Sequence, residues 1–377
     1  MQTEFIGKNS LKNIKKIISN LDAKKILLVT GKGSYKKSGS EEKLIQYLGD
    51  AVIKRFFDFE PNPNIKDVLV GINIISSFKP DLVIAVGGGS VIDIAKLINI
   101  FAVHVVKEKE IYEFVNESSS VKQAGLPLIA IPTTSGTGSE ATHFAVVYIG
   151  NKKYSFAHEY VLPNFSIIDP SLSYSNPAYI KACSGFDALS QAIESFWAVG
   201  STEESRSYSR EAIKIILSSI EMAVLESDKK SMDRMSLAAN LAGKAINISK
   251  TTAAHAVSYP ITKFLDIPHG HAVALTLGSF FVINSRYSES QLNDFRGIQY
   301  FDNISKELLN LFDCSDSEQV SQRLNQIMVN IGLEANLKSI FSKKNIDYEL
   351  IKKEINLERL NNNPVKVNSS QIENLFK

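Results

Sequence analysis

The sequence predicts two domains, an α/β domain over residues 1–172 and an all-helical domain over residues 173–377. Three observations support this prediction. In the first half, short and continuously apolar runs alternate with helical patterns. These runs end at glycines or at hydroxyl residues, as expected where a strand turns toward a helix. After Asp169-Pro170 the strand-like runs stop, and only helical periodicity remains.

Three apolar runs are the predicted strands of the first domain: Lys25–Thr30, Asp81–Val86 and Leu128–Pro132. A strand that is apolar at nearly every position is buried on both faces, which is typical of a parallel sheet covered by helices. The helical patterns of this half span residues 42–48, 66–77 and 90–101. Strand, turn and helix, repeated in this order, predict a doubly wound α/β domain.

The second half shows no strand pattern. Its predicted helices span residues 186–198, 205–224, 229–248 and 318–331. We therefore expect an all-helical domain that begins near residues 170–177, with a cleft between the two domains. A chain of 377 residues is long enough for two such cores.

Composition excludes several classes of protein. The net charge of +2 is too small to indicate binding to nucleic acid or to an anionic membrane. Two cysteines, Cys183 and Cys314, make neither a disulfide framework nor a zinc-thiolate site. The first sixteen residues lack the apolar core of a signal peptide, and no apolar run is long enough to span a membrane. We therefore expect a cytoplasmic protein.

A glycine loop follows the second predicted strand, at Gly87-Gly88-Gly89-Ser90. Three glycines allow the backbone to approach a ligand closely. The N–H groups at the start of the following helix attract phosphate, and Ser90 can cap that helix or bind a phosphate oxygen. The spacing differs from GxGxxG, so it favours a dinucleotide fold other than the standard Rossmann type. A tight structural turn is the alternative.

A second loop, Pro132–Glu140, follows the third predicted strand and is rich in hydroxyl side chains. Hydroxyls and loop amides suit a pyrophosphate, a ribose or a carboxamide, although a solvated turn would have a similar composition. Two such loops in one domain indicate a dinucleotide rather than a single phosphate. The predicted cofactor-binding residues of the two loops and the helix between them are Gly87, Gly88, Gly89, Ser90, Asp93, Thr133, Thr134, Thr137 and Ser139.

The second half contains residues that can bind a metal ion. Asp187 and Gln191, four residues apart, share one face of a helix that we expect Asp187 to open. Three of the six histidines follow between residues 255 and 271: His255, His269 and His271. One carboxylate and two imidazoles can hold Zn²⁺ or Fe²⁺ and leave a position for a substrate oxygen. The alternative is that these histidines are ordinary core or capping groups.

Four motifs resemble those of the iron-containing (group III) alcohol dehydrogenases. They are Gly87-Gly88-Gly89-Ser90 with Asp93 and Lys96, the loop Pro132–Glu140, Asp187-Ala188-Leu189 and Pro268-His269-Gly270. The resemblance extends from about Gly7 to Leu277. It implies an α/β dinucleotide-binding domain followed by an all-α metal-binding domain, an architecture shared with dehydroquinate synthases. It also implies an NAD(P)-dependent enzyme that acts on small alcohols and aldehydes, and a homodimer.

By the same resemblance, Asp187, His255 and His269 match three metal ligands of the family. Gln191 stands where the family usually has a further histidine, and it can bind only through its amide oxygen. This change makes zinc more plausible relative to iron. Tyr259 likewise replaces a histidine that often lies near the substrate, so we expect a catalytic role for it.

The segments around Asp187, His255 and His269 also look like those of phosphonoacetaldehyde reductases, which form 2-hydroxyethylphosphonate. A dianionic substrate requires fixed positive charge near the metal. Lys244, Lys250 and Lys153 are the candidates, and the alternative for each is a solvated surface lysine.

The expected reaction is reduction of an aldehyde by NADPH or NADH, with the metal polarising the carbonyl. His271 is the candidate proton relay, or else it caps the following helix. The family often has an aspartate after the first strand, where this chain has Gly31-Lys32-Gly33-Ser34. Gly31, Lys32 and Ser34 are therefore predicted cofactor contacts that tolerate or favour NADPH. A dehydroquinate synthase-like lyase, or a nucleotide-binding protein without a metal, are the competing interpretations.

Overall fold

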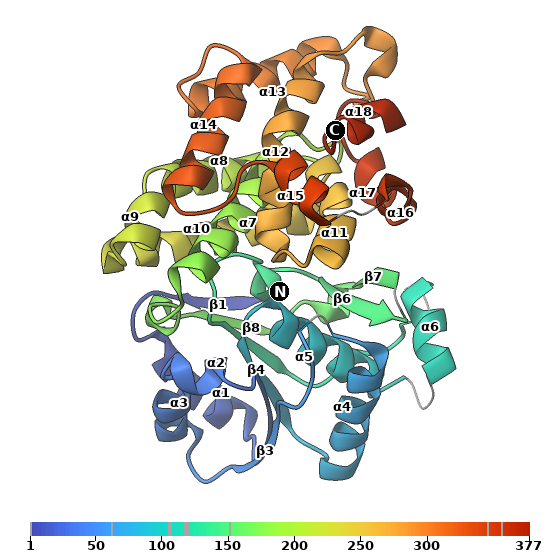
Figure 1. The fold of residues 1–377 in the computed structure, drawn as a ribbon. Helices are drawn as coiled ribbons and strands as arrows, with labels where there is room; N and C mark the ends of the chain where they lie inside the picture. Colours follow the sequence, from blue (N-terminus) through green and yellow to red (C-terminus); the bar gives the residue numbers. More distant parts are fainter. Residues whose placement is uncertain are drawn as a thin grey trace. The chain divides into compact units, whose positions relative to one another are not determined.

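The computed structural model describes residues 2–61, 63–104, 108–116, 121–150, 152–344, 347–355 and 357–377. The chain divides into two compact units, Met1–Asn176 and Pro177–Lys377 (Figure 1). The first unit is an α/β domain and the second is helical, which confirms the predicted fold class.

The first unit is built on a six-stranded parallel sheet with the order β1-β8-β5-β4-β2-β3. A separate antiparallel pair is formed by β6 and β7. The strands are β1 (Thr3–Ile6), β2 (Lys25–Thr30), β3 (Val52–Phe56), β4 (Leu82–Gly87), β5 (Leu128–Pro132), β6 (Phe144–Ile149), β7 (Lys152–Ala157) and β8 (Phe165–Ile168).

Helices cover both faces of this sheet (Figure 1). Leu27 and Val29 of β2 face a core that includes side chains of α4 and α5, whereas Ile26 and Leu28 face a second core with side chains of α1 and α3. Continuous apolar strands are required because each fully buried aliphatic side chain contributes about 1.5–3 kcal/mol. The helices are α1 (Asn13–Leu21), α2 (Ser34–Lys37), α3 (Ser40–Leu48), α4 (Ile65–Phe78), α5 (Gly89–Phe101) and α6 (Glu108–Asn116).

The strand order creates a topological switch between β2 and β4. The chain leaves β2 toward β3 on one side and leaves β4 toward β5 on the other. Ligands of open α/β sheets bind beyond the carboxyl ends of the strands at such a point. Here β2 ends at Thr30, which is paired in register with Val86, and β4 ends one residue later at Gly87. The predicted loops Gly31–Ser34 and Gly87–Ser90 lie at these two ends.

Helices make up the second unit, with α7 at its centre. The helix α7 packs against α8, α10 and α12, and α12 also packs against α11. The helices are α7 (Ala178–Trp197), α8 (Glu203–Leu217), α9 (Ile220–Leu225), α10 (Lys229–Ser249), α11 (Ala253–Leu265), α12 (His269–Ser285), α13 (Ile298–Leu311), α14 (Ser317–Asn330), α15 (Leu337–Lys344), α16 (Tyr348–Lys353), α17 (Leu357–Asn361) and α18 (Ser369–Glu373). In the part of the chain that the structure describes, no helix has both the length and the apolar character needed to cross a membrane.

Three local predictions were wrong. The expected helix over 205–224 is two helices, α8 and α9, which are separated at Ser218 and Ser219. Asp187 does not open a helix but lies in the middle of α7, which begins after Pro177. Ser90 is not a capping residue, because α5 begins at Gly89 and Gly88 occupies the cap position.

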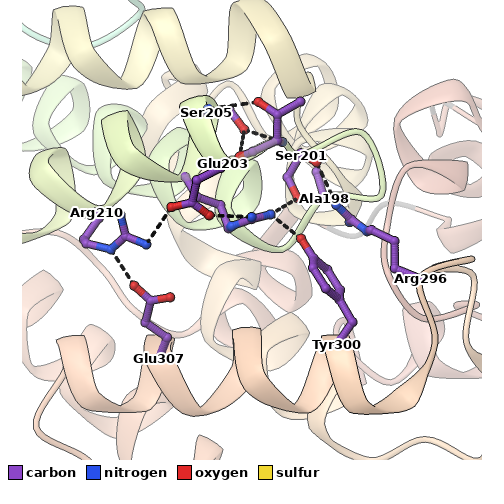
Figure 2. Close-up of polar contacts among 10 residues, drawn as sticks. Ala198, Ser201, Glu203, Ser205, Arg210, Arg296, Tyr300 and Glu307 are labelled. Carbon is purple, nitrogen blue, oxygen red and sulfur yellow. Dashed lines mark hydrogen bonds and ion pairs between the residues drawn. The ribbon is translucent and has the colours of Figure 1, made fainter.

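A polar network fixes the end of α7 against α8 and α13 (Figure 2). The Arg296 guanidinium donates to the carbonyl oxygens of Ala198 at 3.0 Å and Ser201 at 2.7 Å. The Ala198 carbonyl oxygen also accepts the N–H of Ser201 at 2.9 Å, so Arg296 adds a charged donor at the end of the helix. In the same network Arg210 pairs with Glu307 of α13 at 2.5 Å. The α7 scaffold is therefore held at its carboxyl end by charged hydrogen bonds.

Candidate metal centre and cofactor loops

Asp187, His255 and His269 come together in the second unit. Asp187 projects from α7, His255 from α11 and His269 from the first position of α12. Each offers one ligand atom, and these atoms lie within 4.8 Å of one another. Asp187 and His255 are buried, at 2% and 4% exposure. The arrangement suits one divalent cation held by a carboxylate and two imidazoles.

A glycine allows this convergence. A Cβ atom at Gly270 would lie 2.0 Å from the carbonyl oxygen of Cys183 and 2.8 Å from the Cβ of Asp187. Any larger residue would therefore push α12 away from α7. The Pro268-His269-Gly270 motif thus has a physical basis, because the glycine lets the two helices approach and places His269 beside Asp187.

The orientation of His255 is fixed by Glu194, which is fully buried two turns after Asp187 on α7. The His255 Nδ1 atom contacts the Glu194 carboxylate. The same carboxylate accepts hydrogen bonds from the N–H of His255 at 3.2 Å and from the N–H and hydroxyl of Thr252 at 3.1 and 2.9 Å. The carboxylate partner makes Nδ1 the donor and leaves Nε2 to face Asp187, 3.5 Å away. Carboxylate–histidine pairs of this kind orient metal ligands in proteins.

Ser258 orients the His269 ring so that, as in His255, Nδ1 is the hydrogen-bond donor. The Ser258 hydroxyl donates to the carbonyl oxygen of His255 at 2.8 Å, so its oxygen is left to accept from His269 Nδ1, which lies 3.4 Å away. The Nε2 atom of His269 is then the ligand atom. Both imidazoles therefore present the same ring nitrogen to the cation site.

The electrostatics keep Asp187 ionised. Burial by itself raises the pKa of this carboxyl, but the neighbouring His255 and His269 outweigh burial and hold the pKa below its ordinary value. Burial opposes protonation of His255, yet the charges of Glu194 and Asp187 raise its pKa to about 9. A proton on His255 and a divalent cation therefore stabilise the same pair of carboxylates, and they compete for the site.

A buried acceptor supports the presence of a cation. Among the described residues, none donates a hydrogen bond to Asp187 Oδ1, although this atom is inaccessible to water. An unsatisfied buried carboxylate oxygen is costly, and a metal ion would satisfy it. Gln191 lies one turn further along α7 and is hydrogen-bonded to the Asp187 side chain. The donor set therefore fits a divalent metal, with Gln191 beside its carboxylate ligand.

The two predicted catalytic residues lie in different surroundings. The Tyr259 ring stacks on His269, with 5.8 Å between ring centroids. His271 is buried, and its Nε2 donates to the carbonyl oxygen of Glu334 at 2.7 Å. Its Nδ1 must then accept from the Tyr179 hydroxyl at 3.2 Å, and burial lowers the pKa of His271. This geometry describes a neutral histidine with both nitrogens engaged.

The two predicted cofactor loops of the first unit lie side by side because they leave adjacent strands. The N–H of Thr133, after β5, donates to the carbonyl oxygen of Gly87, at the end of β4, at 3.0 Å. A Cβ at Gly89 would lie 2.8 Å from the Thr137 side chain. Gly89 is thus required for the contact, and the predicted hydroxyl residues of both loops gather at one edge of the sheet.

Asp93 and Ser139, both predicted cofactor contacts, are hydrogen-bonded to each other at 2.6 Å. Beside them the buried Lys96 ammonium donates to the carbonyl oxygens of Ser139, Thr142 and Phe144 at 2.6–2.9 Å. Burial lowers the pKa of Lys96 to about 8, while Asp93 and Glu140 act in the opposite direction. Lys96 therefore fastens the second loop to α5.

At the end of β2, Gly31 and Ser34 are adjacent, since a Cβ on Gly31 would meet the Ser34 hydroxyl. Lys32 is exposed and forms ion pairs with Glu60 at 3.0 Å and Asp58 at 3.3 Å. These partners raise the pKa of Lys32. Two carboxylates therefore already engage the lysine that the sequence predicted as a cofactor contact.

The three predicted substrate lysines lie on β7, within α10 and directly after α10. Lys153 belongs to β7 in the first unit, where its charge acts on Asp93. Lys244 is on α10, with its ammonium 5.8 Å from the Tyr208 ring centroid. Lys250 is exposed at the end of α10, two residues before Thr252, which bonds Glu194. Among the three, Lys250 is the closest in sequence to His255, and its own side chain is exposed.

Comparison with known proteins agrees with this geometry. Residues 2–170 match the model of the iron-containing alcohol dehydrogenases, and residues 181–377 match that of the C-terminal domain of the same family. This chain belongs to the iron-containing alcohol dehydrogenase family. It is accordingly a metal-dependent, NAD(P)-dependent alcohol dehydrogenase or aldehyde reductase, as the resemblance implied. Family membership favours this activity over the lyase considered above.

Several relatives illustrate the range of this family. An NADPH-dependent butanol dehydrogenase of Clostridium saccharobutylicum is 33% identical over 75% of this chain and 73% of its own length. A 1,3-propanediol dehydrogenase of Klebsiella pneumoniae is 29% identical over 99% and 96%. Among solved structures, a sulfoacetaldehyde reductase of Bifidobacterium kashiwanohense in complex with NAD⁺ is 30% identical, with a TM-score of 0.85, over 100% of this chain and 96% of its own.

Glu194 is a site residue that the sequence alone did not reveal. The feature that could have indicated its role is its spacing, because a residue seven positions after Asp187 lies on the same face of the helix. A glutamate in a helix is usually solvated, however, and only the packing of α11 against α7 shows that this one is buried beside His255.

Replacing Glu194 with glutamine is expected to weaken the binding of Zn²⁺ by about tenfold to a hundredfold. The amide cannot accept all the hydrogen bonds that the carboxylate accepts, so His255 loses its fixed tautomer. Competition with a chromophoric chelator measures the affinity. Glu211→Gln, at an exposed position of α8, is the matched control. Equal affinities in Glu194→Gln and Glu211→Gln would contradict the role of Glu194.

Proposed function

We propose that this alcohol dehydrogenase works as a reductase of small aldehydes that carry an anionic phosphonate or sulfonate group. The convergence of Asp187, His255 and His269 carries the reductase part of the proposal. The proposed substrate class rests on two likenesses to known reductases.

The metal ligands proposed are Asp187, His255 and His269. Gln191, whose side chain interacts with the Asp187 carboxylate, is a proposed further ligand through its amide oxygen. When bound, a divalent cation supplies the Lewis acidity that polarises an aldehyde carbonyl. A set of one carboxylate, two imidazoles and an amide contains no soft ligand, so it suits Zn²⁺ and Fe²⁺. Glu194 and Ser258 hold the two imidazoles in the orientation that this requires.

Tyr259 is proposed to shape the substrate side of the centre, since its ring covers the His269 imidazole. His271 is proposed to orient the Tyr179 hydroxyl, since its Nδ1 accepts from that hydroxyl while its Nε2–H is donated to the Glu334 carbonyl. A ring bonded at both nitrogens and with a pKa lowered by burial stays neutral, so the relay predicted from the sequence would require these bonds to change. Water remains the simplest source of the proton that completes the alcohol.

The proposed substrate class rests on two likenesses. The segments that carry the metal ligands look like those of phosphonoacetaldehyde reductases, and the sulfoacetaldehyde reductase matches this chain over its whole length. Phosphonoacetaldehyde and sulfoacetaldehyde share a two-carbon aldehyde and an anionic tetrahedral group. Lys250, and after it Lys244, are the lysines of the second unit proposed to attract that charge. Phosphonoacetaldehyde, reduced to 2-hydroxyethylphosphonate, is our first candidate.

A panel of aldehydes tests the proposal. The Zn²⁺- and Fe²⁺-loaded enzymes are assayed for NADPH and NADH oxidation with phosphonoacetaldehyde, sulfoacetaldehyde, acetaldehyde and butanal at equal concentrations. We expect kcat/KM for an anionic aldehyde to exceed that for butanal by at least about tenfold, because a charge-assisted contact contributes about 1.5–3 kcal/mol. A preference for butanal would contradict the substrate class and leave the dehydrogenase activity intact.

A further inference from the structure

A guanidinium group is fixed at the carboxyl end of β2, beside the topological switch of the sheet. Arg55 lies on β3, and its Nε donates to the Thr30 hydroxyl at 2.8 Å. Its Nη2 donates to the carbonyl oxygen of Gly31 at 3.3 Å. Through these two hydrogen bonds the Arg55 side chain, which starts on β3, is held at the carboxyl end of β2, where the predicted cofactor loop begins.

Two aromatic rings hold the guanidinium in place. The Arg55 Cζ atom lies 4.7 Å from the centroid of Tyr35 and 4.5 Å from that of Phe57. Stacking between rings restrains the plane of a guanidinium and leaves its edge available for hydrogen bonds. Little conformational entropy then remains to be lost when an anion binds.

The two cationic side chains near the end of β2, Lys32 and Arg55, differ in their partners. Lys32 is engaged by Asp58 and Glu60, as described above. Arg55, in contrast, forms no ion pair with a carboxylate of the described residues. Two of its five N–H groups are used in the bonds to Thr30 and Gly31. Gly31 itself adds no side chain and no negative charge at the end of β2.

We propose that Arg55 binds the 2′-phosphate of NADPH and so determines the cofactor preference of the enzyme. This inference rests on the proposed dinucleotide-dependent reduction. The adenosine ribose of a dinucleotide lies at the carboxyl end of a strand beside the switch point, and an arginine there accommodates a 2′-phosphate. The planar fork of a guanidinium matches the oxygens of a phosphate, and its stacked position makes the site preorganised. Lys32 then contributes less to binding of the phosphate, because Asp58 and Glu60 compete for its ammonium.

Charge-removing and charge-keeping variants of the full-length enzyme test this role. In Arg55→Gln, kcat/KM for NADPH is expected to fall by about tenfold to a hundredfold, while kcat/KM for NADH changes less than about twofold. Arg55→Lys keeps the charge but loses the fork, so we expect an intermediate loss. Lys54→Gln is the matched control, because this exposed residue precedes Arg55 and points to the opposite face of the strand. Parallel losses with both cofactors, or no change in their ratio, would overturn the inference.

A binding measurement separates this inference from the proposed function. Calorimetry compares 2′,5′-ADP with 5′-ADP on the wild-type protein, Arg55→Gln and Gly31→Asp. The wild type is expected to bind 2′,5′-ADP at least about tenfold more tightly than 5′-ADP. Both variants should lose that difference, because Arg55→Gln removes the guanidinium and an aspartate at position 31 would neutralise the Arg55 charge and repel the 2′-phosphate. If the difference is present and lost as expected but no aldehyde is reduced, the proposed function fails and the role of Arg55 stands. Equal binding of the two nucleotides by the wild type overturns the role of Arg55.

Discussion

The His269→Ala variant is expected to lose tight binding of divalent metal and to reduce aldehydes at least about a thousandfold more slowly. The substitution removes one of three converging ligands and leaves Asp187 with a single imidazole partner. Lewis-acid polarisation contributes several kcal/mol to such a reaction, and ~4 kcal/mol corresponds to about a thousandfold in rate. Metal content after dialysis, and NADPH oxidation with the preferred aldehyde, measure the two effects.

Two controls separate loss of the metal from loss of the fold. Trp197 is the single tryptophan, and it lies buried in the second unit with its indole N–H bonded to Thr252 at 2.9 Å. An unchanged tryptophan emission spectrum therefore reports an intact helical unit. His158→Ala removes a histidine at the start of a short turn in the first unit and should retain metal and activity. Full activity in His269→Ala would refute the metal centre.

The interior of the fold was predictable because its signals are local. The strands β2, β4 and β5 are apolar throughout and end at glycine or hydroxyl loops, so their sequences alone predict them. The edge strand β3, which reads Val-Ile-Lys-Arg-Phe, is largely exposed and carries two charges. An edge strand is defined by its pairing with a neighbour, and that pairing has no local signature. The position of Arg55 could not be predicted for the same reason.

In the candidate site, too, some features could be predicted from the local sequence and others depend on tertiary packing. Asp187, His255 and His269 were predicted from residue type and resemblance, and the structure brings them together. The start of α7 was misplaced, although Pro177 at the preceding position is a typical signal of a helix start. The closeness of α12 to α7 depends on Gly270, whose role appears only when the two helices are packed together. Residue identity and resemblance thus selected the three candidate ligands, and tertiary packing determines their geometry.

Replacing Lys96 with methionine is expected to destabilise the first unit by about 3–5 kcal/mol, the usual cost of removing one partner from a buried charged network. The carbonyl oxygens of Ser139, Thr142 and Phe144 would lose their shared donor, and Asp93 would lose its neighbouring positive charge. A loss of this size lowers the unfolding temperature by roughly 10 °C for a domain of this length. Scanning calorimetry of the full-length protein measures it.

The same substitution should also weaken dinucleotide binding, because Lys96 holds the loop that carries Thr137 and Ser139 against α5. Metal affinity, which depends on residues of the second unit, should be unchanged, so the two measurements distinguish a local effect from general unfolding. Lys66→Met on the exposed face of α4 is the matched control. The double variant Asp93→Asn/Lys96→Met should recover part of the lost stability, since it no longer leaves a carboxylate without its counter-ion. If Lys96→Met and Lys66→Met unfold at the same temperature and bind cofactor equally, Lys96 does not hold the loop.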